Sequence, residues 1–230
     1  MVTFSESDDL RGARFIGADL SGAVLRGVDL QGVEIESPWL FDAGNTLIVN
    51  GVDVLPYVDA ELDRRFPGRA ERRAADPDGL RAAWTAVEQT WTATLARAAA
   101  MPTGTVDASV QGEWSFAQTL RHLVHATDIW FGRTILELED PFHPAGLRYD
   151  SPVQPTALSY AEILEVRSGR VAMVRDYLAE ATPEILAEPR RNPHAPEKSV
   201  TVLSALHVIL GEEWEHHRYA VRDLDALQTS

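Results

Sequence analysis

The chain of 230 residues contains no cysteine and only one lysine, Lys198. Without cysteine it can form neither a disulfide framework nor a zinc site with thiolate ligands, and it has no thiolate nucleophile of its own. With one lysine, a mechanism through a lysine Schiff base is not expected. The main candidates for metal binding or catalysis are therefore histidine and carboxylate side chains.

The chain is also poor in positive charge, with a formal net charge of -14 at pH 7. Phosphate backbones and anionic lipids are bound by basic surfaces, so we expect neither nucleic acid nor a membrane as a partner. No apolar run reaches the length of a membrane span, and the acidic N-terminal stretch lacks the basic and apolar regions of a signal peptide. We therefore expect a cytoplasmic protein.

The N-terminal segment contains an internal repeat with a period of five residues. Large apolar residues recur at 10, 15, 20, 25, 30 and 35, smaller ones precede them by two positions, and glycine recurs at 12, 17, 22, 27 and 32. A narrow solenoid needs this pattern, because both apolar side chains point inward and glycine permits a turn in each repeat. The register, clearest at Ala18-Asp19-Leu20, resembles the pentapeptide-repeat family. We expect a β-coil of about one and a half turns, too short to stand alone or to act as a DNA-mimicking rod.

A hairpin and a short helix are predicted after the repeats. Asn50-Gly51 lies between two β-branched runs within residues 45–55, which is a strong signal for a two-residue turn. Residues 56–66 form an amphipathic pattern, and the stretch 69–75, rich in arginine and alanine, is typical of a linker.

Four long amphipathic helices follow, and capping signals mark their starts. The predicted helices cover residues 76–101, 115–135, 159–177 and 201–224. Similar lengths and one long crossover at 139–158 favour a four-helix bundle.

We therefore predict a mainly α protein with three parts. They are a pentapeptide-repeat β-coil and hairpin at 1–55, a short helix and linker at 56–75, and a four-helix bundle with one long crossover at 76–230.

The last predicted helix carries Glu213 and His217 four residues apart, which places both side chains on one helical face. That face is the apolar stripe of the helix, so both groups fall where the helix meets the core. A buried carboxylate needs a strong partner, and a metal ion is one candidate. A Glu–His hydrogen bond without an ion, or a helix rotated to leave both groups in water, fits the same spacing.

A metal site in a bundle core needs ligands from more than one helix. The second predicted helix offers His122, beside the inward-facing Leu123, and His125, which is rotated toward the flank. Each is also compatible with an ordinary histidine at the edge of the core.

Together these features resemble the DinB-like metalloprotein superfamily. The residues that carry the resemblance are Trp114-Ser115, His122-Leu123 and His216-His217-Arg218. The superfamily has a four-helix bundle in which one histidine of the second helix and an i, i+4 pair of the last helix bind a metal. The resemblance therefore implies His122, Glu213 and His217 as ligands. Glutamate at position 213 resembles the branch of mycothiol-dependent maleylpyruvate isomerase, which has glutamate at this ligand position.

Two imidazoles and one carboxylate leave coordination positions open for water or substrate. Zinc is the first expectation, and nickel or iron also suits this ligand set. The resemblance further implies a low-molecular-weight thiol such as mycothiol, which a chain without cysteine must take from solution. We expect an enzyme that activates such a thiol or water for transfer, isomerisation or hydrolysis of a small molecule. The alternative is a non-catalytic, metal-stabilised binding module.

Further residues are candidates for lining the pocket or supporting the ligands: His125, His207, His216 and Arg218. None of them is assigned a catalytic role. We also expect a homodimer, because bundles of this superfamily often pair and pairing would give the coil a partner surface.

Overall fold

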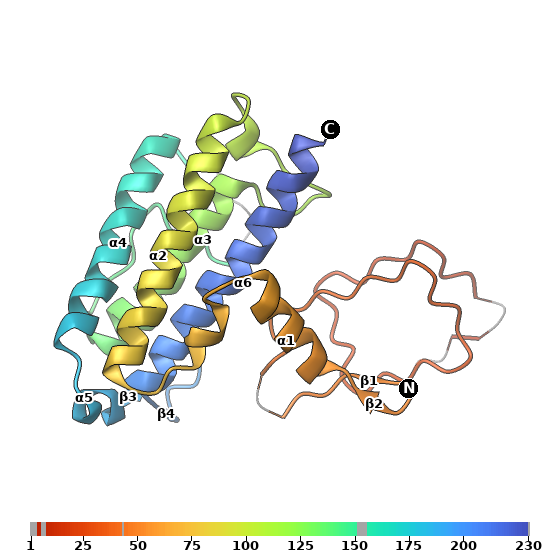
Figure 1. The fold of residues 1–230 in the computed structure, drawn as a ribbon, viewed down its shortest axis with the longest axis horizontal. Coiled ribbons are helices and arrows are strands. Elements are labelled where there is room, and N and C mark those ends of the chain that lie inside the picture. The colour runs from red at the N-terminus through yellow and green to blue at the C-terminus, as the bar shows by residue number, and fades with distance from the viewer. Residues whose placement is uncertain (1–3, 6–7, 43, 151–155, 230) are drawn as a thin grey trace. The chain divides into compact units, whose positions relative to one another are not determined.

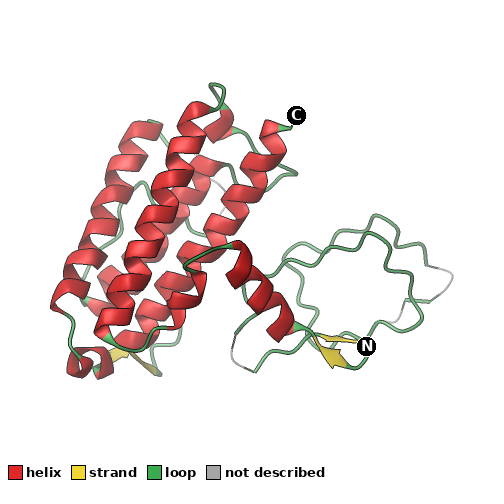
Figure 2. Cartoon of the chain, viewed as in Figure 1, coloured by secondary structure: helices red, strands yellow, loops and turns green. Residues whose placement is uncertain are grey.

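The computed structural model describes residues 4–5, 8–42, 44–150 and 156–229. The chain divides into two compact units, Met1–Ser37 and Pro38–Ser230. The prediction of a mainly helical protein with an N-terminal coil and a hairpin is confirmed (Figures 1 and 2). The hairpin, which was predicted together with the coil, falls within the larger unit.

The smaller unit is a coil built of turns. Backbone hydrogen bonds close one turn in every second repeat, from the Ala13 N–H to the Leu10 carbonyl and at the equivalent positions 20–23 and 30–33. The glycine of each repeat has a positive φ, for example 72° at Gly12, which explains why the repeat requires glycine there. No described residue between 8 and 36 is buried, so the coil encloses no core of its own, contrary to the expectation of inward-pointing side chains.

The larger unit begins with the predicted hairpin, β1 (Ile48–Val49) and β2 (Val52–Asp53). The strands pair antiparallel, with Val49 opposite Val52. Asn50 and Gly51 both have positive φ, 49° and 85°, as a type I′ turn requires.

A short helix, α1 (Leu55–Arg65), and a 3-10 turn, η1 (Arg69–Arg73), follow the hairpin. Arg69 is buried and pairs with Asp59 at 2.7 Å and with Asp63 at 2.6 Å. Burial acts to raise the pKa of Asp63, but hydrogen bonds from Arg73 and Arg69 outweigh it and lower the pKa. The stretch that was predicted to be a linker is thus an ordered turn fastened to α1 by ion pairs.

The bundle is made by the four predicted long helices, which run side by side in Figure 1. They are α2 (Pro77–Ala100), α3 (Phe116–Thr127), α4 (Tyr160–Glu180) and α6 (Val202–Gln228). Asp76, Ser115, Ser159 and Thr201 cap their first turns through side-chain oxygens, as the sequence predicts. The fully buried side chains of the core include Leu80, Trp84, Leu120, Leu206 and Ile209.

The second predicted helix does not continue as an α-helix to residue 135. It ends at Thr127 and passes into η3 (Asp128–Ile135), a segment with π-helical hydrogen bonding. Gly132 of this segment contacts the crossover so closely that an added Cβ would lie 2.6 Å from the Cβ of Pro141. The wide π-helical turn of η3 therefore packs closely against the crossover at Pro141.

Three further short elements lie between α4 and α6. A single turn, α5 (Pro183–Ala187), precedes a small antiparallel pair, β3 (Pro189–Arg191) and β4 (Ser199–Thr201), which the sequence reading missed. No described helix is both long enough and apolar enough to cross a membrane.

Candidate metal centre

Helix α6 presents two Glu–His pairs with the same spacing to different neighbours. Glu212 and His216 face α3, while Glu213 and His217 face the core between α2 and α4. Adjacent helical residues are rotated by about 100°, so a shift of one residue changes every partner.

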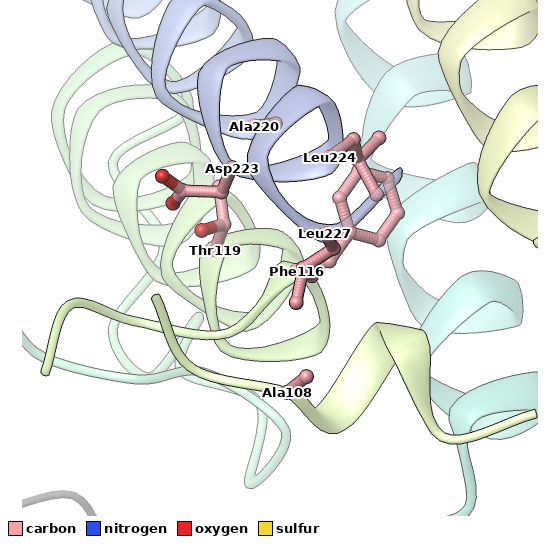
Figure 3. Close-up of a pocket in the computed structure, with 7 residues that line it drawn as sticks. All are labelled: Ala108, Phe116, Thr119, Ala220, Asp223, Leu224 and Leu227. Carbon is pink, nitrogen blue, oxygen red and sulfur yellow. The ribbon is translucent and has the colours of Figure 1, made fainter. Parts of the chain in front are cut away.

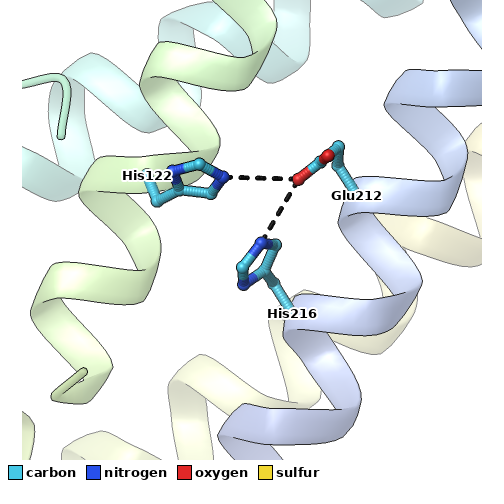
Figure 4. A group of neighbouring side chains, drawn as sticks. All are labelled: His122, Glu212 and His216. Carbon is cyan, nitrogen blue, oxygen red and sulfur yellow. Dashed lines mark hydrogen bonds and ion pairs between the residues drawn. The ribbon is translucent and has the colours of Figure 1, made fainter. Parts of the chain in front are cut away.

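His122 of α3 meets the first pair (Figure 4). The Glu212 Oε2 atom lies 3.3 Å from His122 Nε2 and 3.2 Å from His216 Nε2. One ligand atom from each residue lies within 4.8 Å of the other two, and this is the one such group among the described residues. The side chain of His122 is 8% exposed and that of Glu212 is 32% exposed, so the group opens to solvent on the side of the carboxylate.

The electrostatics of this triad, His122, Glu212 and His216, favour an ionised carboxylate beside neutral imidazole. Burial acts to raise the pKa of Glu212, but hydrogen bonds to His122 and His216 outweigh it and lower the pKa. Burial lowers the pKa of His216, and the nearby Glu212 opposes that shift only in part. A carboxylate and a neutral imidazole are the forms that bind a metal ion.

Trp114, at the turn before α3, packs against both imidazoles. Its ring centroid lies 4.8 Å from that of His122 and 6.0 Å from that of His216, and it stacks on the latter at an interplanar angle of 18°. Tyr219 makes an edge contact with His216 at a centroid distance of 5.9 Å. Two aromatic rings therefore pack against His216.

The second pair does not approach His122 in this way. Both oxygens of Glu213 accept hydrogen bonds from Nη2 of Arg167 in α4, and both side chains are buried. His217 forms a 2.8 Å hydrogen bond with the hydroxyl of Thr94. Burial lowers the pKa of His217 to about 4.

The predicted set of His122, Glu213 and His217 is thus not brought together by the fold. His122 instead groups with Glu212 and His216, one residue earlier on α6. The prediction that Glu213 lies on the buried face is accurate, because the side chain is 1% exposed. Its partner is a guanidinium, which satisfies a buried carboxylate without an ion.

The other candidate side chains, His125, His207 and Arg218, each have a partner outside the triad. His125 stacks on Phe142 of the crossover with centroids 5.5 Å apart. His207 bonds through Nε2 to the Ala74 carbonyl at 2.7 Å, which ties α6 to the start of α2. Arg218 pairs with Glu215 at 3.1 Å, so its charge has a partner within α6.

A small pocket lies between α3 and the last turns of α6 (Figure 3). Thr119 precedes His122 by nearly one turn, and Ala220 follows His216 by one turn. Its lining residues are Ala108, Phe116, Thr119, Ala220, Asp223, Leu224 and Leu227. Apolar groups dominate the lining, and the space has room for little more than one water molecule.

Comparison with known families supports this reading of the bundle. A family model described as the DinB superfamily matches residues 86–220, and a model described as pentapeptide repeats (8 copies) matches residues 9–36. No curated protein and no solved structure matches the chain. The DinB match spans more than half of the chain and includes all three residues of the triad. The chain therefore belongs to the DinB superfamily, with pentapeptide repeats near its N-terminus.

Proposed function

We propose that this chain is a metal-dependent enzyme whose ion is bound by His122, Glu212 and His216. The observation that carries the proposal is the spacing of the three ligand atoms. Atoms about 2.1 Å from a tetrahedral ion lie about 3.4 Å from each other. Two of the three separations, 3.3 and 3.2 Å, are close to this value, and all three ligand atoms lie within 4.8 Å of one another.

The donor set also supports an open catalytic site over a closed structural one. Two imidazoles and one carboxylate leave a fourth position, and Glu212 is the most exposed of the three side chains. When bound there, a divalent ion would lower the pKa of a coordinated water or thiol toward neutrality. Zinc fits this set best, and nickel and iron share its ligand preferences.

The chain's own residues would then hold, orient and shield the reacting group. The triad fixes the ion, and Trp114 covers the two imidazoles and limits the access of water. Because the chain has no cysteine, a thiol nucleophile would be a low-molecular-weight thiol of the mycothiol type, used for transfer or isomerisation. Activated water would serve for hydrolysis.

A second candidate function is a metal-stabilised binding module without catalysis. The small size of the pocket favours it, because little substrate surface can be enclosed there. The same three ligands would then serve only to fix α3 against α6.

Metal analysis of the purified chain after reconstitution tests the site itself. We expect one zinc per chain in the wild type and a large loss in Glu212→Gln, since the amide is a poor ligand. Glu165→Gln makes the same change on an exposed face of α4 and should keep the metal. A wild type without stoichiometric divalent metal would overturn the proposal.

Thermal-shift measurements with low-molecular-weight thiols separate the two candidate functions. Stabilisation by a thiol only when the metal is present supports the enzyme. Stabilisation by metal with no response to any thiol or small electrophile supports the binding module.

A further inference from the structure

The crossover contributes to the triad even though it supplies no ligand. Residues 145–147 lie along α3 and are joined to it by three hydrogen bonds. Arg121 Nε donates to the Ala145 carbonyl at 3.0 Å, and the Leu147 N–H donates to the Arg121 carbonyl at 3.1 Å. The third bond joins His122 Nδ1 to the Leu147 carbonyl at 3.0 Å.

The third bond determines which nitrogen of His122 is available. A carbonyl oxygen only accepts, so the proton of this bond must sit on Nδ1. The Nε2 proton, which bonds to Glu212, is then the one that an ion would displace, and its loss leaves the lone pair on Nε2. A histidine that binds a metal through one nitrogen usually donates from the other to a carbonyl or carboxylate in this manner.

The same segment is packed too tightly to shift freely. Arg121, Ala145 and Leu147 are all buried, at 5%, 0% and 3% exposure. Between them, an added Cβ on Gly146 would lie 3.3 Å from the Cβ of His125 and 3.1 Å from the His143 carbonyl.

A second anchor holds the crossover two residues before this segment. The His143 N–H donates to Asp128 at 2.8 Å, and Asp128 also pairs with Arg170 of α4. The chain that leads to the carbonyl facing His122 is therefore held at residue 143 and again at residues 145–147.

We propose that Arg121 is a positioning residue for the metal centre. Its guanidinium holds the Ala145 carbonyl, which keeps the Leu147 carbonyl against His122 Nδ1 and directs Nε2 into the triad. This inference rests on the proposed metal function, but the hydrogen bond from His122 Nδ1 to the Leu147 carbonyl that it requires is present without metal.

The variant Arg121→Met removes the Nε donor while keeping an apolar stem of similar length. We expect its zinc affinity, measured by competition with a chelator, to fall by about 10–100-fold, the usual effect of losing support behind a histidine ligand. The visible absorption of the cobalt-substituted protein should shift as well, because the ligand field changes. Arg190→Met is the matched control. It removes a 3.1 Å bond from a guanidinium to the Ile135 carbonyl, which does not contact the triad.

Long-range ¹H–¹⁵N spectra of the wild type test the tautomer directly and do not depend on the folding of a variant. We expect His122 to carry a proton on Nδ1 without metal, and to bind zinc through Nε2 after reconstitution. An Nε2–H tautomer would overturn the inference, and so would equal zinc affinities for the folded variants Arg121→Met and Arg190→Met. A wild type that shows the Nδ1–H tautomer but binds no metal would instead overturn the proposed function alone.

Discussion

The variants His216→Ala and His217→Ala make the same change at adjacent positions of α6, yet the structure predicts opposite effects. His216 belongs to the triad with His122 and Glu212. His217 lies in the core and bonds to Thr94. Comparing the two variants therefore tests which of two adjacent histidines on α6 belongs to the site.

His216→Ala should act on metal binding and hardly on the fold. Zinc binds structural sites with about 10–16 kcal/mol, so one ligand corresponds to roughly 3 kcal/mol and to about a 100-fold weaker affinity. The side chain is only 14% exposed, but it stacks on Trp114 at the edge of the bundle rather than in its centre. We expect the metal-free free energy of unfolding to fall by about 1 kcal/mol.

His217→Ala should act on the fold and hardly on metal binding. The Thr94 hydroxyl donates to the Thr90 carbonyl, so it accepts its second bond from His217 Nε2–H, and the variant leaves that acceptor site empty. The imidazole also makes edge contacts with Phe66 and Trp91, with centroids 5.9 and 5.3 Å away. A cavity among these rings and a lost hydrogen bond should cost about 3 kcal/mol of unfolding free energy.

Two assays on each variant distinguish these outcomes. Competition with a chelator gives the zinc affinity, and urea denaturation of the metal-free protein gives the free energy of unfolding. Loss of zinc from His217→Ala with full binding by His216→Ala would refute the geometry described above. It would also restore the ligand set that the sequence predicts.

Four other predictions follow from packing and charge. Glu213→Gln leaves Arg167 buried without its carboxylate and should lower the free energy of unfolding by about 3–5 kcal/mol in urea, while the double variant Glu213→Leu/Arg167→Met should recover most of this loss. Gly132→Ala should cost about 1–3 kcal/mol because its Cβ would overlap Pro141, and an unchanged melting temperature would contradict that packing. The pKa of Asp63 is lowered in the folded chain, so its ion pairs stabilise the fold above the ordinary pKa of 3.8 and are lost as the pH falls through the folded value. Asp63→Asn should therefore cost roughly 2 kcal/mol near pH 7 and little once the pH lies below the folded pKa, and an equal cost in both conditions would be inconsistent with this linkage. Sedimentation at micromolar concentration should give a homodimer, and a monomer would exclude the predicted pairing.

The helix starts were predictable because capping is a local property of the sequence. Ser115 and Gln118, for example, exchange their hydrogen bonds within one turn. The π-helical segment η3 was not predictable in this way. Its wide turn is accommodated by contact between Gly132 and Pro141, and the crossover that brings them together is a tertiary feature.

The coil illustrates a different limit of sequence reading. The five-residue period encodes a turn with glycine at positive φ, and that local geometry is present in every repeat. Burial of the large apolar residues depends on stacked neighbouring coils, which so short an array does not supply.

The sequence predicts the types of residue in the candidate site, one glutamate and two histidines, but not their exact positions on α6. The apolar stripe of α6 correctly identified Glu213 and His217 as buried, at 1% and 5% exposure. The residue that explains the burial of Glu213 lies on another helix. Arg167 follows Ile163 by one turn and is buried with it on α4, so a guanidinium was available to the core carboxylate.

Access to solvent explains why the face of α6 that carries Glu212 and His216, rather than the core, suits an open metal site. Glu213 lies behind packed helices, where a guanidinium neutralises it permanently and no small molecule can reach it. Glu212 has the same spacing to a histidine, but a third of its side chain is exposed and His122 stands opposite. A site that exchanges water or thiol needs both convergent ligands and an opening. Of the two Glu–His pairs on α6, only the one at 212 and 216 combines these properties.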